Sequence, residues 1–150
     1  MSSRINPYIV AKDAMEGVFA FNKATRQNSL EPKLVELVKT RASQINHCAF
    51  CLEMHTREAR EAGESEARLY LLTAWRESTL YTPRERAALA WTEALVTLPE
   101  SGAPDEDYEL AHSCFSDQEL VELTLVISMI TVWNQLGVGF RRHHAHPKAE

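Results

Sequence analysis

Two cysteines and a histidine lie close together in the segment Cys48-Ala-Phe-Cys51-Leu-Glu-Met-His55. In a helix, successive residues rotate by roughly 100°, so these three side chains fall within about a 60° arc of one face. Two thiols that can form a disulfide, beside a group that can move a proton, have the parts that dithiol redox chemistry requires. This spacing therefore predicts a redox-active site.

The residues before the first cysteine indicate how the two thiols are presented. We expect a helix that runs to about Ile45 and breaks at Asn46-His47, which places Cys48 at or just before the next helix N-terminus. Unpaired N–H groups and the helix dipole stabilise a thiolate there. Cys51 lies in the first turn, four residues before His55, which could take its proton. The helix N-terminus favours Cys48 as the attacking thiol and the histidine favours Cys51, and we take Cys51 as the hypothesis.

A carboxylate upstream of this segment could extend the site. Glu36 is the nearest upstream carboxylate that could extend a proton relay from His55, provided that the two helices pack together.

Two other interpretations of the two cysteines stay open. In one, Cys48 and Cys51 are small buried structural residues. In the other, they bind a metal with His55, although structural zinc requires four ligands. The missing donor would have to be Cys114 or a C-terminal histidine (His143, His144 or His146). We expect no metal.

Composition limits the class of protein. With 150 residues, 45% hydrophobic and 25% charged, the chain has the size of one globular domain, which we predict over residues 1–150. The net charge of −5, without a lysine-arginine run, argues against a nucleic-acid partner. The first residues have no apolar signal core, and the apolar stretch from Leu123 to Trp133 is too short to span a membrane. Three cysteines do not form a secreted disulfide framework. We therefore expect a cytoplasmic protein.

Helix signals recur along the chain, and no convincing strand pattern is present, so we predict an all-α fold of about six or seven helices. A long helix from Leu120 to about Leu136 is apolar nearly all round, which favours a central position or cover by another subunit. The other helices are expected to start at capping residues followed by apolar stripes. These starts are Asp13, Ser29-Leu-Glu-Pro32, Ser65, Thr82-Pro and Ser116.

Several other residues have ordinary structural interpretations. We interpret Cys114 as a structural thiol, and the three tryptophans as core or interface residues rather than a pocket wall. Asn134 is an amide within an apolar helix and needs partners, so it should cap a neighbouring backbone or cross an interface. The tail Arg141-Arg-His-His-Ala-His146 is expected to be a solvated terminus.

The pattern of Glu36, eleven residues, CxxC, three residues and His55 resembles the AhpD-like alkylhydroperoxidases of the carboxymuconolactone decarboxylase superfamily. Downstream, residues 83–95 are similar to that family's next helix, and residues 132–140 are similar to its closing helix. The resemblance covers most of the chain. It implies an AhpD-like helical fold that assembles into homo-oligomers, either trimers or hexamers.

The resemblance also implies an activity. It points to a thiol-dependent hydroperoxide reductase in antioxidant defence, with Cys48, Cys51, His55 and Glu36 as catalytic residues. No cofactor is expected, because an external dithiol of lipoyl or thioredoxin type would reduce the enzyme. Decarboxylase members of the superfamily generally lack the CxxC pair, so its presence favours the redox branch over lactone chemistry.

One departure from the family keeps other functions open. The better-studied peroxidases carry a second histidine between the two cysteines, whereas this chain has Ala49 and Phe50 there. His47 precedes Cys48 and would point elsewhere on a helix. The first alternative is therefore a thiol-disulfide oxidoreductase or redox sensor with weak peroxidase activity. The second is a non-enzymatic helical oligomer that binds a metal.

Overall fold

The computed structural model of the protein describes residues 4–142, and within this range the chain forms helices and no strand. The all-α prediction is confirmed, but nine α-helices and one 3₁₀ turn are present rather than six or seven helices. In chain order they are α1 (Pro7–Val10), α2 (Lys12–Thr25), α3 (Pro32–Ile45), α4 (Ala49–Glu61), α5 (Glu66–Leu71), η1 (Leu72–Ala74), α6 (Pro83–Val96), α7 (Leu98–Ser101), α8 (Asp105–Cys114) and α9 (Asp117–Gly139).

The helices that the sequence did not predict share a physical reason. α1 and α7 have four residues each, which is too short for an apolar stripe to repeat. α8 is longer, but Ala111 is its one buried residue, so its sequence shows little apolar periodicity. A prediction that depends on hydrophobic pattern therefore misses these three helices.

Side-chain caps start several helices where they were expected. Thr82 and Ser116 each form a capping box with the glutamate three residues later. Ser65 accepts a hydrogen bond at the start of α5. The predicted cap at Asp13 is wrong, because α2 begins earlier, with Ala11 as an N-cap that makes no side-chain bond. Asp13 instead lies in the first turn, where the helix dipole favours a carboxylate.

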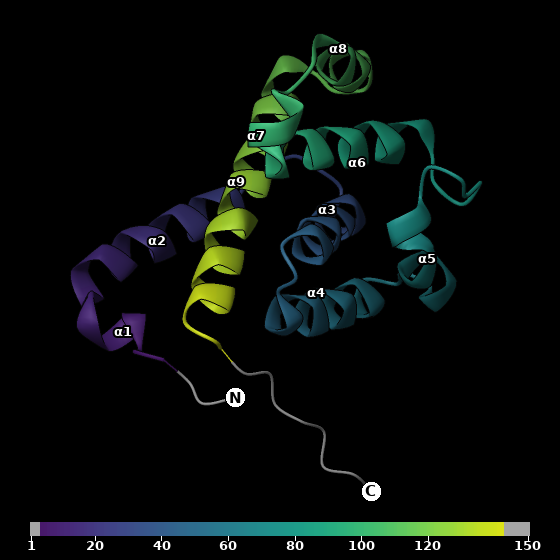
Figure 1. The fold of residues 1–150 in the computed structure, drawn as a ribbon. Coiled ribbons are helices and arrows are strands. Elements are labelled where there is room, and N and C mark those ends of the chain that lie inside the picture. Colours follow the sequence, from purple (N-terminus) through teal and green to yellow (C-terminus); the bar gives the residue numbers. More distant parts are fainter. Residues whose placement is uncertain (1–3, 143–150) are drawn as a thin grey trace, which may run out of the picture.

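α9 is the central helix of the fold. It runs through the middle of Figure 1, with α2 on one side and α3 and α4 on the other. Leu123, Ile127 and Ile130 on its inner side are almost completely buried. The prediction of a central apolar helix is confirmed, and the helix begins slightly earlier than expected because Ser116 caps it.

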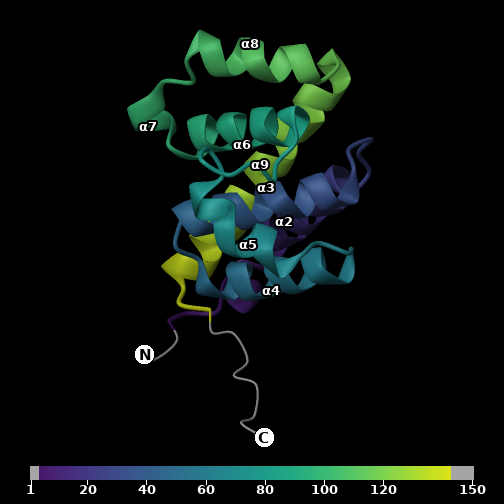
Figure 2. The same ribbon diagram turned by 90° about the vertical axis from the view of Figure 1, so that its right-hand side faces the viewer.

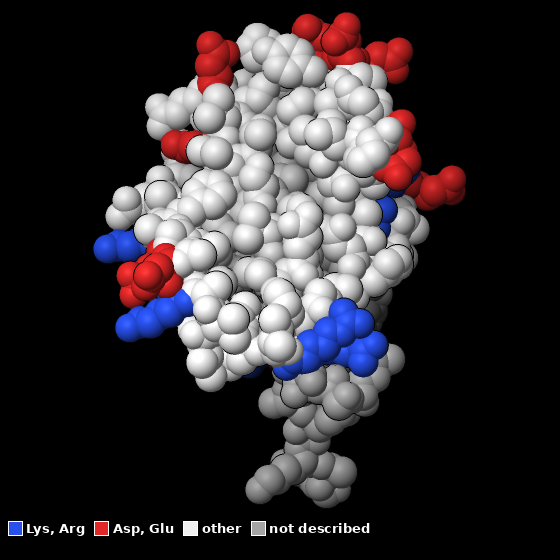
Figure 3. All heavy atoms as spheres, turned by 60° about the vertical axis from the view of Figure 1, so that its left-hand side comes forward, with Lys and Arg blue, Asp and Glu red and all other residues white. Residues whose placement is uncertain are grey.

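The length of α9 corrects one expectation. It is the one described helix that is long and apolar enough, by length and composition, to cross a membrane. The stretch from Leu123 to Trp133, on which the sequence prediction was based, is shorter than this helix, so the apolar length was underestimated. Its packing against α2, α3, α4 and α6 is that of a core helix. On its remaining face Val121, Leu125 and Val138 are exposed. Figure 3 turns the left-hand side of Figure 1 forward and shows a broad uncharged area with charged groups at its edges.

The remaining helices stack in layers on the other side of the central helix. Figure 2 shows α8 above α6, then α3, then α4, and each of these neighbours is in contact with the next. α3 therefore lies between α4, α6 and α9. This arrangement brings the side chains of α3 against the start of α4, which is where the cysteines are.

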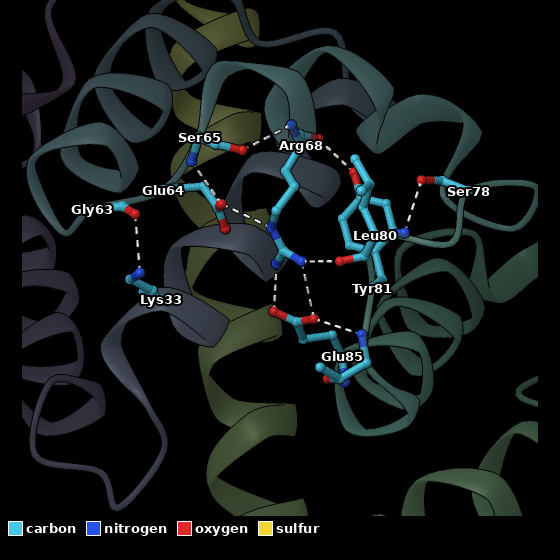
Figure 4. A network of polar contacts seen from close by, with 10 residues as sticks. Lys33, Gly63, Glu64, Ser65, Arg68, Ser78, Leu80, Tyr81 and Glu85 are labelled. Carbon is cyan, nitrogen blue, oxygen red and sulfur yellow. Dashed lines mark hydrogen bonds and ion pairs between the residues drawn. The ribbon is translucent and has the colours of Figure 1, made fainter.

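A partly buried polar network holds the α4–α5 connection against the start of α6 (Figure 4). The Arg68 guanidinium donates to Glu64 Oε1 at 2.8 Å and pairs with Glu85 of α6. Its guanidinium carbon also lies 4.8 Å from the centre of the Tyr81 ring. Burial raises the pKa of the Glu85 carboxyl, but the Arg68 and Thr82 hydrogen bonds outweigh burial and hold it below its usual range. The network thus fixes the far end of α4 by paired charges.

Candidate active site

Cys48 and Cys51 form a disulfide at the start of α4. Cys48 is the N-cap of the helix, and its sulfur accepts a hydrogen bond from the Cys51 backbone N–H at 3.3 Å. The turn before it contains His47 with a φ of 54°, a left-handed conformation that ends α3 abruptly. The predicted break and the position of Cys48 at the helix N-terminus are both confirmed, and His47 itself is exposed.

The disulfide is enclosed by apolar side chains. Both cysteines are at least 98% buried, and they pack with Ala42 of α3 and Ile130 of α9. Cys51 lies at the edge of a large cavity, whereas Cys48 is not among the residues that line it. The cavity therefore adjoins Cys51 rather than Cys48.

His55 and Glu36 meet across α4 and α3. The His55 Nδ1 atom lies 2.8 Å from Glu36 Oε2, and the imidazole is buried one turn beyond Cys51. Burial raises the pKa of the Glu36 carboxyl, but its hydrogen bond with His55 and the charge of Lys39 outweigh burial and hold it below its usual range. Glu36 is therefore an anion at neutral pH and can only accept a hydrogen bond. The hydrogen of the Glu36–His55 bond must therefore be carried by His55 Nδ1.

The other ring nitrogen of His55 is left available. Nε2 is buried and has no hydrogen-bond partner among the described residues, while the His55 ring lines the same cavity as Cys51. With Nδ1 protonated, Nε2 is the acceptor of the neutral imidazole. The structure thus brings Glu36, His55 and Cys51 together as the sequence predicted, with an unpaired base at the cavity.

Glu58 is a neighbour of this site that the sequence analysis missed. Its Oε2 atom lies 3.4 Å from His55 Nδ1, and its side chain is 37% exposed. The signal was present, because Glu58 follows His55 by three residues and therefore shares its helix face. Donor atoms of Glu36, His55 and Glu58 all lie within 4.8 Å of one another, so this trio could hold a cation.

Among the described residues, two members of the metal set considered from the sequence are not available as ligands. Cys48 and Cys51 are bonded to each other, so neither is a thiolate ligand in this state. Cys114 lies at the end of α8, with its sulfur 4.0 Å from the Pro83 carbonyl oxygen of α6. The C-terminal histidines lie outside the described residues. The oxidised site therefore offers carboxylate and imidazole donors, without the thiolates.

The cavity beside Cys51 has a volume of about 1000 Å³. It lies between the N-terminal segment, α4 and the C-terminal half of α9, and aromatic rings form much of its wall. These rings belong to Tyr8, Phe19, Phe50, Trp133 and Phe140. Trp133 lines the cavity and also packs against the buried cluster around Cys48 and Cys51, so the predicted core packing does not exclude a place in the pocket wall. Its Nε1 donates to Asn22 Oδ1 at 3.0 Å. Trp75 and Trp91 are buried core residues as predicted.

Two residues of α9 contact the disulfide and the end of α3 that precedes it. A Cβ on Gly137 would lie 2.9 Å from Cys48 Sγ, so only glycine allows this close approach. One turn earlier, the Asn134 amide donates to Ser43 Oγ and accepts from Asn46 Nδ2, each at 3.0 Å. Asn134 therefore bonds side chains of its own chain rather than a neighbouring backbone. Neither contact has a geometric signal in the sequence.

The sequence model of the carboxymuconolactone decarboxylase family matches residues 12–94. The chain belongs to this family. The matched range contains Glu36, both cysteines and His55, whereas the α9 residues that line the cavity lie outside it. The cavity wall is therefore formed partly by the matched range and partly by segments outside it.

Similar proteins agree with this assignment. The Bacillus subtilis protein YdfG, which is uncharacterised, is 39% identical over 139 residues, covering 93% of this chain and 95% of YdfG. The Agrobacterium tumefaciens protein ATU0492 superposes with a TM-score of 0.94 at 41% identity, covering 97% of this chain and 100% of that chain. A role as the antioxidant defence protein AhpD has been suggested for it. The protein is thus an AhpD-like member of the carboxymuconolactone decarboxylase family.

A more distant structure shares the fold. The debrominase Bmp8 superposes with a TM-score of 0.81 at 17% identity, covering 90% of this chain and 73% of Bmp8. At that identity the likeness concerns architecture alone. The carboxymuconolactone decarboxylase fold is therefore compatible with more than one chemistry. The reaction depends on the side chains of the site rather than on the fold.

Proposed function

We propose that this protein is a thiol-dependent hydroperoxide reductase that acts in antioxidant defence. The observation that carries the proposal is the Cys48–Cys51 pair with Cys51 at a cavity, beside an imidazole whose Nε2 has no partner among the described residues. Redox-active dithiols need an accessible attacking sulfur and a base to make it a thiolate. AhpD-like family membership supports the same class of reaction.

The first step uses the reduced enzyme. His55 Nε2 accepts the proton of the Cys51 thiol, and the resulting imidazolium is stabilised by the Glu36 carboxylate at Nδ1. The Cys51 thiolate attacks the terminal oxygen of the hydroperoxide, and the O–O bond breaks. The alkoxide leaves as an alcohol after it takes the proton from His55, and Cys51 becomes a sulfenic acid.

The second step returns the enzyme to the observed disulfide. The Cys48 sulfur attacks the Cys51 sulfur, a disulfide forms, and hydroxide leaves as water with the Cys48 proton. An external dithiol of lipoyl or thioredoxin type then reduces the disulfide through a mixed disulfide. Overall, one hydroperoxide and one dithiol give one alcohol, one water and one external disulfide. The cavity position favours Cys51 as the peroxidatic cysteine, because Cys48 does not line it.

Phe50 favours a second candidate function. It lies between the two cysteines, lines the cavity and has no group that moves a proton. A site with a single imidazole could exchange disulfides efficiently while reducing peroxides slowly. The second candidate is therefore a thiol-disulfide oxidoreductase or redox sensor, and the ratio of the two rates distinguishes it from the first.

Assembly and location are further parts of the proposal. The exposed apolar residues of α9, together with Ile9 and Phe19 of the N-terminal helices, support a homo-oligomer, either a trimer or a hexamer. Light scattering tests this point, since a monomer has a mass of 17.0 kDa. We propose a cytoplasmic protein with neither nucleic-acid nor membrane partners.

The test of the function is steady-state consumption of tert-butyl hydroperoxide with excess small dithiol. Wild type should turn over, and Cys51→Ser should lose the activity. Cys48→Ser should form a sulfenic acid on Cys51 that a dimedone probe traps. If Cys51→Ser keeps full turnover, the mechanism is wrong. If wild type exchanges its disulfide but consumes no hydroperoxide, the oxidoreductase candidate replaces it.

A further inference from the structure

The cavity beside Cys51 is far larger than a small peroxide needs. Its volume is about 1000 Å³, whereas a water molecule, which is close to hydrogen peroxide in size, occupies about 30 Å³ of liquid. Pockets of roughly 300–1000 Å³ accommodate ligands of drug size. The cavity therefore has room for a hydroperoxide with a long organic chain.

The wall of the cavity is suited to an apolar chain. Tyr8 stacks on Phe19 with ring centres 6.0 Å apart, and Phe19 contacts Trp133 at 5.7 Å. Val126, Met129 and Ile130 of α9 line another part of the same space. Aromatic and aliphatic surface of this kind gains free energy when it covers apolar ligand surface. The bulk of the ligand should therefore be hydrocarbon.

Arginines add positive charge at the end of the cavity where the first and last described segments meet, and the contacts of Arg4 and Arg142 define their positions. The Arg142 guanidinium carbon lies 3.9 Å from the centre of the Phe50 ring, and its Nη1 donates to the Tyr8 hydroxyl at 2.7 Å. Arg4 donates to the Gly139 carbonyl oxygen at 2.8 Å. Both side chains line the cavity. Figure 3 shows basic groups gathered at the lower edge of the uncharged area.

These guanidinium groups keep donors for an anion. Within residues 4–142, no carboxylate lies within ion-pair distance of Arg4 or Arg142. Lys39, which also lines the cavity, is already paired with Glu36 at 2.8 Å. A guanidinium has five N–H donors in a fork that matches a carboxylate. The acidic side chains Glu36 and Glu58 lie at the imidazole, so a ligand carboxylate is directed away from them and toward the arginines.

We infer that the substrate of this site is an amphipathic hydroperoxide that carries a carboxylate, such as the hydroperoxide of a long-chain unsaturated fatty acid. The inference rests on the proposed function, because it names the substrate class of the same cysteine. The carboxylate binds at Arg4 and Arg142, and the hydrocarbon chain lies against the aromatic wall. The fatty acid hydroperoxide and one external dithiol give one hydroxy fatty acid, one water and one external disulfide.

The kinetic test compares three substrates at concentrations below micelle formation. These are linoleic acid hydroperoxide, its methyl ester and tert-butyl hydroperoxide, each with excess small dithiol. The acid should exceed the ester in kcat/KM by about tenfold, which is the effect of a single charge-assisted contact. Arg142→Gln should remove most of that preference, whereas Arg57→Gln, an exposed arginine of α4, should keep it. Equal rates for acid and ester, or an equal loss for both in Arg142→Gln, would overturn the inference.

A binding test separates this inference from the proposed function. Quenching of tryptophan fluorescence by linoleic acid and by its methyl ester is measured on the oxidised protein, which needs no turnover. The acid should bind about tenfold more tightly, and Trp133→Phe should remove most of the signal. If no hydroperoxide is turned over but the acid binds selectively, the proposed reaction fails and the ligand class stands. If neither the acid nor the ester binds, the ligand class fails whatever the enzyme does with tert-butyl hydroperoxide.

Discussion

Gly137 of α9 faces Cys48 so closely that a Cβ at this position would lie 2.9 Å from the Cys48 sulfur. The same Cβ would lie 3.6 Å from Cys51 Sγ. A Cβ atom rarely approaches a non-bonded atom as closely as the first of these distances, and the cysteine is held by its N-cap position and its disulfide. The central helix therefore touches the redox pair at a point where no side chain fits.

This contact predicts that Gly137→Ala destabilises the oxidised protein. Overpacking typically costs about 1–3 kcal/mol, although alanine otherwise stabilises a helix interior relative to glycine by about 0.5–1 kcal/mol. Urea unfolding measures the difference. The matched control is Gly139→Ala on the same helix, where a Cβ meets nothing within 4 Å and should cause no such loss. Equal stability of Gly137→Ala and wild type would contradict the proposed contact.

The two carboxylates near His55 should contribute unequally to turnover. Glu36 lies 2.8 Å from Nδ1 and is mostly buried, whereas Glu58 lies at 3.4 Å with a half-exposed side chain. Glu36→Gln should lower kcat/KM by about tenfold or more, and Glu58→Gln by a factor of about two, because solvent screens the longer contact.

The control for these variants is Glu53→Gln, which changes an exposed carboxylate of the same helix. It should leave tert-butyl hydroperoxide turnover at the wild-type rate. A larger loss in Glu58→Gln than in Glu36→Gln would mean that Glu58 orients the imidazole.

The lowered pKa of Glu36 predicts a dependence of stability on pH. Burial raises this pKa, but the His55 hydrogen bond and the Lys39 charge outweigh it, so the folded carboxyl titrates below its ordinary value of 4.5. A group with a lowered folded pKa contributes stability above the unfolded pKa, and the contribution is lost as pH falls through the folded pKa. The free energy of unfolding should therefore fall in acid more steeply for wild type than for Glu36→Gln.

Urea unfolding of the oxidised protein at a series of pH values measures this difference. Burial also raises the pKa of Glu85 and Glu93, and hydrogen bonds from Arg68 and Trp75 respectively outweigh it. Both carboxyls are present in each variant, so their contributions cancel in the comparison. Parallel curves for wild type and Glu36→Gln would exclude the stabilising pair.

Asn134 should be important for stability although it performs no chemistry. It is 1% exposed and bonds both Ser43 in the last turn of α3 and Asn46 at the C-cap of that helix. Asn134→Ala leaves the buried Ser43 hydroxyl and the partly buried Asn46 amide without their partner, and an unsatisfied buried group costs about 1–3 kcal/mol. The melting temperature should therefore fall by several degrees. The exposed neighbour Gln135 provides the control, since Gln135→Ala should melt as wild type does.

The redox segment shows what could be read directly from the chain. Helical geometry alone places Cys48, Cys51 and His55 on one face, and local backbone preferences predict the break at Asn46-His47. Capping residues and hydrophobic periodicity act within a few positions, so they also predicted the all-α class and the central helix. Short helices such as α1 and α7 lack that periodicity, and their number was underestimated.

The sequence by itself determined which residues could do redox chemistry, because the spacing of the CxxC pair and His55 acts within one helix. Only the tertiary structure decided what surrounds them. The pairing of Glu36 with His55 depends on how α3 packs on α4, and the cavity wall comes from α1, α2 and the end of α9. The need for glycine at position 137 arises from the approach of two segments about ninety residues apart. Local preferences extend over a few residues, whereas such contacts depend on how whole helices pack.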